Sequence, residues 1–122
     1  MSWNTEVIMV AGYKIPRDVF QLGYNKWEEM TFGENGNPDL AIYADNFIDT
    51  DPCTGEGPVF FGEILHFFDP AEEINIAWDI NKIYTPAAYI VKLKAGVHDF
   101  FDDFLPLGFE FNFSKWVTVR LV

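Results

Sequence analysis

The chain has 122 residues and a formal net charge of −11, and 49% of its residues are apolar and 18% aromatic. This length predicts one globular domain over residues 1–122, and the apolar content argues against disorder. Such a negative charge repels phosphate and no stretch approaches the roughly 20 apolar residues of a membrane helix, so we expect neither direct nucleic-acid binding nor membrane binding.

The first third of the chain predicts a strand, a helix and a second strand. The apolar, partly β-branched run over 7–11 is typical of a buried strand. Pro16 suits the first position of a helix that should end by residue 33, with aromatic side chains recurring at helical spacing. A loop over 33–39, rich in Gly and Asn, follows, and residues 40–44 then predict a short strand.

The strongest strand pattern lies over 59–68. Both of its faces are apolar, which predicts an inner strand that is covered on both sides. A capping pattern at 69–72 predicts a helical turn. Residues 74–81 alternate between apolar and polar side chains, which favours a half-exposed strand; a helix with its apolar residues on one side is the alternative.

The C-terminal part predicts more strand and one helix. Residues 89–95 alternate, with lysines pointing outward, and Gly96 closes the pattern. Apolar residues over 97–105 return to helical spacing. Residues 109–121 alternate in one phase, which predicts either one long strand or two strands joined by a bend at Lys115.

These elements predict an α+β fold. Most connections are too short for the crossover that joins parallel strands. We therefore expect a single domain with a largely antiparallel sheet of five or six strands, and two or three short helices on one face.

A long acidic stretch stands out against this pattern. Between Lys26 and Lys82 there is no other basic residue, yet the stretch holds thirteen of the chain's nineteen acids: Glu28, Glu29, Glu34, Asp39, Asp45, Asp49, Asp51, Glu56, Glu63, Asp69, Glu72, Glu73 and Asp79. Loops over 33–39 and 49–58 should place several of them on the surface. A solvated face is the simplest explanation, but such faces usually mix both signs of charge.

The acidic loop that contains Asp49 and Asp51 is a candidate for calcium binding. Asp49 and Asp51 have the spacing that begins a calcium loop, but the sixth and twelfth positions hold Thr54 and Phe60 in place of Gly and Glu. The calcium-loop pattern therefore fails. A looser cage of carboxylates would draw on Asp45, Asp49, Asp51 and Glu56.

Catalytic patterns are weak. Nearby carboxylates disfavour a reactive thiolate at Cys53, the single cysteine, and one cysteine permits no internal disulfide, which suits a cytoplasmic protein. His98 and Asp102 share a helix face, but solvated charges explain them, and His66 fits a hydrogen-bonded core position. We find no phosphate loop or nucleophile elbow, so we expect no cofactor, no metal and no catalytic residue.

The sequence favours a binding function over catalysis. In length, charge and aromatic content the chain resembles the small acidic inhibitors found among phage anti-defence proteins and bacterial immunity proteins. The resemblance implies a partner with a basic surface, such as a surface that binds nucleic acid, on an enzyme or a toxin. A small enzyme or calcium-dependent module built on the loop over 45–56 is the alternative. The partner-binding candidates are Glu34, Asp39, Asp45, Asp49, Asp51 and Glu56.

Overall fold

The computed structural model describes residues 4–68 and 83–121. Its helices and strands follow the order β1 (Thr5–Ile15), α1 (Arg17–Phe32), η1 (Pro38–Asn46), β2 (Phe47–Asp49), β3 (Val59–Phe68), α3 (Ala87–Phe101), η2 (Asp102–Phe104) and β4 (Ser114–Leu121), where η marks a 3₁₀ helix. The helical turn predicted at 69–72 and the strand predicted at 74–81 lie outside the described residues.

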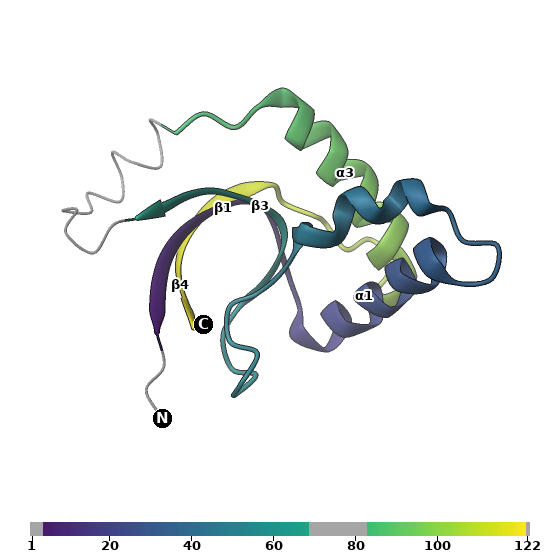
Figure 1. Cartoon of the computed structure of the whole chain (residues 1–122), viewed down its shortest axis with the longest axis horizontal. Coiled ribbons are helices and arrows are strands. Elements are labelled where there is room, and N and C mark those ends of the chain that lie inside the picture. The colour runs from purple at the N-terminus through teal and green to yellow at the C-terminus, as the bar shows by residue number, and fades with distance from the viewer. Residues whose placement is uncertain (1–3, 69–82, 122) are drawn as a thin grey trace.

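The sheet has the order β2-β3-β1-β4, and every neighbouring pair is antiparallel (Figure 1). This confirms the predicted α+β fold with an antiparallel sheet. The described residues form four strands, fewer than the five or six that the sequence predicts.

The sheet curls strongly along its length (Figure 1). Gly12 of β1 faces Gly62 of β3, and a Cβ atom on Gly12 would lie only 2.3 Å from the carbonyl oxygen of Phe61. The two strands therefore approach each other more closely here than side chains allow. At the other end of the sheet, the amide of Leu121 donates a hydrogen bond to the carbonyl of Thr50 at 2.9 Å, which ties β4 to the chain that follows β2.

Each face of the sheet carries a separate hydrophobic cluster. The larger cluster joins β1 and β3 to α1, η1 and α3, and Phe61 lies in it with no exposed surface. The smaller cluster holds Phe60, Ile8, Val10 and Ile48. The N-terminal half of β3 is thus covered on both faces, as predicted, while its C-terminal half is more open: His66 is half-buried and Phe67 is exposed.

Residues 40–44 form part of η1 instead of the predicted strand. The side chain of Asn37 caps this 3₁₀ helix by accepting a hydrogen bond from the amide of Asp39 at 3.0 Å, and Pro38 suits the first position. Five apolar residues were too short a pattern to separate a strand from a helix, and the capping sequence before them decided the outcome.

Two further strand predictions are wrong. Residues 89–95 belong to α3, because Leu93 continues the buried stripe formed by Val97 and Phe100. Residues 109–113 pair with no described strand; the ring of Phe111 instead packs edge-on against Tyr13, with ring centroids 5.9 Å apart. Neither α3 nor any other helix within residues 4–68 and 83–121 has the length and apolar content to cross a bilayer.

The position of Phe61 predicts the effect of its removal. Because Phe61 is fully buried between the sheet and both helices, Phe61→Ala should lower the free energy of unfolding by about 3–5 kcal/mol, and Phe61→Asp should prevent folding. Chemical denaturation measures the first effect. Phe67→Ala, at an exposed position of the same strand, serves as the control and should cost about 1 kcal/mol or less. Equal losses for the two alanine variants would contradict the assignment of β3 to the core.

Candidate functional site

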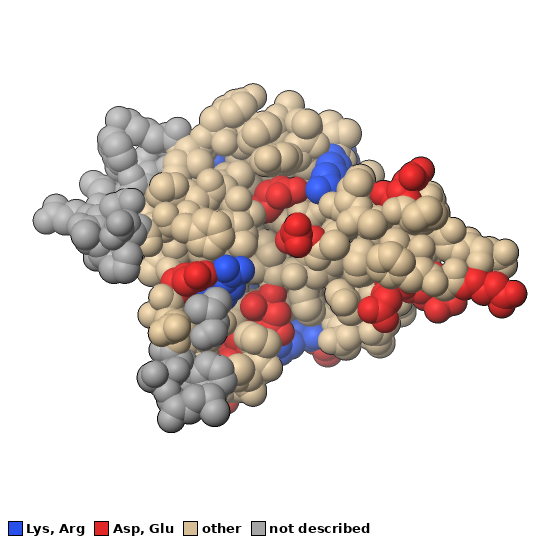
Figure 2. Space-filling model, in the orientation of Figure 1, with Lys and Arg blue, Asp and Glu red and all other residues tan. Residues whose placement is uncertain are grey.

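Apart from Glu63 on β3, the described acids of the acidic stretch lie in two separate places; Asp69, Glu72, Glu73 and Asp79 fall outside the described residues. One, which we call the acidic tip, comprises the C-terminal end of α1, the turn that follows it and η1; its exposed carboxylates are Glu28, Glu29, Glu34, Asp39 and Asp45. Figure 2 shows acidic side chains without basic ones among them at the end of the molecule where Figure 1 places this turn. The other place is the loop between β2 and β3, well removed from the tip in Figure 1.

Arg17 organises the loop between β2 and β3. Its guanidinium forms an ion pair with Asp49 across two hydrogen bonds, at 2.8 and 3.2 Å. The same group donates to the carbonyl of Gly57 through Nε at 3.1 Å and through a terminal nitrogen at 2.8 Å. A planar guanidinium suits such paired contacts. Asp49 therefore holds the loop in shape and is not a free surface charge.

Asp51 is the clearest correction to the sequence analysis. The loop pattern placed it on the surface, but the residue is only 8% exposed. Its carboxylate accepts hydrogen bonds from the hydroxyl and the amide of Thr54. These bonds, the hydroxyl first, hold the pKa of the Asp51 carboxyl below its ordinary value, despite the opposing effect of desolvation. Asp51 thus closes the turn, and of the predicted loop acids only Glu56 stands exposed here.

Several basic side chains are paired with acids outside the tip. Lys26 contacts Asp103 at 2.5 Å, Lys92 contacts Glu63 at 3.0 Å and Arg120 contacts Glu6 at 2.6 Å. Together with Arg17, four of the basic residues in the described part of the chain neutralise carboxylates that lie away from the tip. The five carboxylates of the tip take part in none of these ion pairs, and Asp18, Glu56, Asp99 and Glu110 are likewise exposed on other parts of the described chain.

Exposed apolar side chains accompany the carboxylates of the tip. Phe32 is 64% exposed at the end of α1, and Ile42 is 62% exposed on η1. Phe32 also borders a shallow hollow with Glu28 and Glu29. Sequence reasoning missed both apolar residues. The sequence pattern that could have revealed Phe32 is its position off the helical stripe that ends at Trp27. Trp27 itself is buried and donates its indole N–H to the carbonyl of Leu40 at 2.7 Å.

The described residues do not assemble the looser calcium cage. No group of three or more His, Cys, Asp or Glu side chains in 4–68 and 83–121 is arranged to hold a metal ion. Asp49 is engaged with Arg17 and Asp51 with Thr54, while Asp45 lies on η1. Cys53 is exposed in the same turn.

Comparison with known proteins leaves the function to be inferred from the side chains. No protein-family model matches the chain, and no curated protein or solved structure matches it either.

The contacts of Arg17 predict its contribution to stability. Arg17→Met removes the ion pair with Asp49 and the hydrogen bonds to Gly57, so it should lower the free energy of unfolding by about 1–3 kcal/mol, with the lower end favoured by partial exposure. Lys94→Met, at an exposed position of α3, is the control and should change stability by about 0.5 kcal/mol or less. Denaturation of both variants measures the difference, and an Arg17→Met protein as stable as the control contradicts this role.

Asp51 predicts a pH dependence of stability. Because its pKa is lowered in the folded state, its contribution is complete above the ordinary value of 3.8 and is lost as the pH falls through the lowered folded value. The Asp51→Asn variant should therefore lose less stability than wild type as the pH falls through this acidic range. Melting temperatures of wild type and variant across the range measure this, with Asp99→Asn, exposed on α3, as the control. Parallel curves for Asp51→Asn and wild type would show that the carboxylate does not stabilise the fold.

Proposed function

We propose that this chain is a non-catalytic binding protein that covers a basic surface of a partner protein, in particular the nucleic-acid-binding surface of an enzyme. The observation that carries the proposal is the acidic tip, which has five exposed carboxylates, while four of the described basic residues are paired with acids elsewhere. A surface of one sign attracts a partner of the opposite sign and repels partners of its own sign.

The tip combines the two features that a protein interface needs. Its carboxylates act at a distance and raise the rate of association with a basic partner. Phe32 and Ile42, exposed beside them, provide apolar area that can be buried on contact and slow dissociation. Anchors of this kind, ringed by polar groups, are typical of the centre and rim of interfaces.

The proposal assigns different roles to the candidate binding residues. Glu34, Asp39 and Asp45 lie on the tip and are exposed, so we propose them as direct contacts. Glu56 is exposed on the separate loop and would contact a partner only if its surface extends that far. Asp49 and Asp51, in contrast, would support binding through the shape of that loop. An inhibitor of a basic toxin, as in immunity proteins, would use the same surface and differ only in its partner.

Matched charge reversals test the proposal. Glu34→Lys changes the tip, whereas Asp18→Lys makes the same change of charge in the first turn of α1. The two positions lie on the order of 20 Å apart along the helix. A lysine opposes the helix dipole at position 18 and suits it near position 34, so the control should lose more stability than the tip variant. Weaker binding by Glu34→Lys alone therefore cannot come from unfolding.

The measurement starts with capture of partners from a lysate of the organism that encodes the chain, at about 0.05 M and about 0.5 M salt, since the screening length falls severalfold between them. Association rates of the purified partner follow. We expect the rate to fall by about threefold or more for Glu34→Lys, to change little for Asp18→Lys, and to fall with salt for wild type. If the association rate changes neither with salt nor with Glu34→Lys, the tip is only a solvated face.

A further inference from the structure

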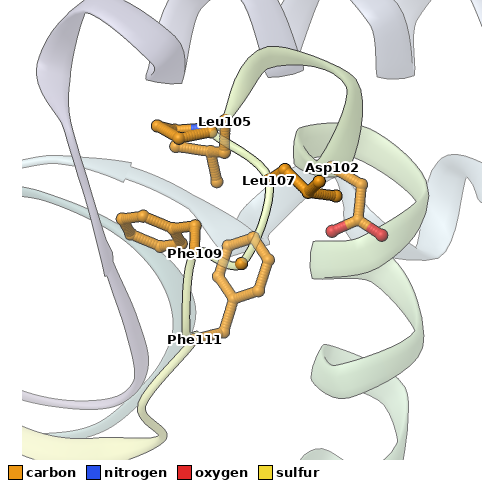
Figure 3. A pocket seen from close by; sticks show the side chains of 7 residues that line it. Asp102, Leu105, Leu107, Phe109 and Phe111 are labelled. Atoms are coloured by element: carbon orange, nitrogen blue, oxygen red, sulfur yellow. The ribbon is translucent and has the colours of Figure 1, made fainter.

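A second surface feature lies at the C-terminal end of α3, where Asp103 contacts Lys26 of α1. A cavity of about 370 Å³ opens where the chain leaves η2 and turns at Gly108. Figure 3 shows the rings of Phe109 and Phe111 next to each other on one side of this cavity and the carboxylate of Asp102 on another. Leu105 and Leu107 complete the apolar part of the wall.

The aromatic wall is held by ring contacts. Phe109 and Phe111 meet edge to face, with ring centroids 5.2 Å apart. Phe111 also packs edge-on against His98 at 5.2 Å and against Tyr13 at 5.9 Å. These contacts tie the turn to α3 and to β1, so the rings form a defined surface. Phe109 remains partly exposed and Leu107 fully exposed, which leaves their apolar surface open to a ligand.

The charged wall is negative for three reasons. Asp102 lines the cavity, and Nδ1 of His98 lies 3.0 and 3.2 Å from its two carboxylate oxygens, so the two side chains form an ion pair when His98 is protonated. Lys26 pairs with the neighbouring Asp103 instead of with Asp102. The carbonyl groups at the end of α3 add the negative end of the helix dipole. An anion would meet repulsion from the carboxylate of Asp102 and from the carbonyl end of α3.

We propose that this pocket binds the positively charged end of an arginine side chain presented by the partner. A carboxylate beside aromatic rings suits a planar cation on an apolar stem, because the carboxylate pairs with the charge while the rings contact the stem and the face of the cation. The cavity volume is near the lower limit for ligand-binding pockets, so the cavity suits one side chain better than a larger cofactor. The inference rests on the proposed function only for the source of the arginine.

Two blocked amino acids test the pocket without any partner protein. N-acetyl-arginine methylamide carries the cation, and N-acetyl-citrulline methylamide is nearly the same shape without charge. Titration of the whole chain, followed by the NMR signals of Leu107, Phe109 and Phe111, should give saturable shifts with the arginine probe at a dissociation constant on the order of 10 mM. The citrulline probe should bind at least about fivefold more weakly than the arginine probe.

Asp102→Asn and Asp103→Asn provide a matched pair of variants. Both remove one negative charge from the same turn, but only Asp102 lines the pocket. Asp102→Asn should weaken binding of the arginine probe by about fivefold, whereas Asp103→Asn should change it by less than about twofold. Phe109→Ala should weaken binding of the arginine probe as well, through loss of its ring.

Three results would overturn the inference. Equal binding of the two probes would show an apolar pocket that does not recognise charge, and equal weakening by the two Asp variants would show attraction to the general negative field. Shifts that stay linear up to about 50 mM would show no site at all. None of these results depends on the acidic tip, so a failure here is distinct from a failure of the Glu34→Lys test.

Discussion

The ring of Phe47 connects the helices to the sheet. It lies in the short strand β2, and its centroid is between 5.1 and 6.0 Å from six other rings: Phe20, Tyr24, Trp27, Phe61, Phe100 and Phe101. These rings come from α1, β3 and α3, so one side chain brings three elements together. Each such pair adds about 0.5–1.5 kcal/mol beyond the area it buries. The acidic tip and the pocket at the end of α3 keep their positions because both helices are fixed through this contact.

Helix packing around Phe47 demands very small residues at two places. A Cβ atom on Gly23 of α1 would lie 2.2 Å from the ring of Phe101, and one on Gly96 of α3 would lie 2.7 Å from the ring of Tyr43. The large number of aromatic residues is thus matched by glycines that make room for them. In the sequence, Gly96 marked the end of the predicted strand over 89–95, because propensity reflects the isolated chain and not the packing of its neighbours.

The fold could be predicted where one periodicity prevailed. Strand β3 and helix α1 followed from their apolar spacing, since both bury apolar side chains in the larger cluster. The last strand also followed from its alternation, although its side chains are at most partly buried and only Trp116 packs against a core cluster. The strand prediction for residues 89–95 was wrong because their apolar side chains fit both an alternating and a helical pattern. Only the continuation of the apolar stripe beyond Gly96 distinguishes a helix from a strand here. Residues 109–113 alternate without a described strand partner, because ring contacts, and not a ladder of hydrogen bonds, hold Phe111 and Phe113 to Tyr13.

The acidic character could be predicted from the sequence, but not the role of each acid, since ion pairs such as Arg17 with Asp49 join residues far apart in the chain. At physiological ionic strength the screening length is about 8 Å, so a partner senses mainly the charges next to its point of contact. A carboxylate that already accepts a guanidinium adds little to that field. The described acids of the stretch therefore differ in role: those of the tip are exposed, as are Phe32 and Ile42 on the same elements, whereas Asp49 and Asp51 hold their own loop in shape.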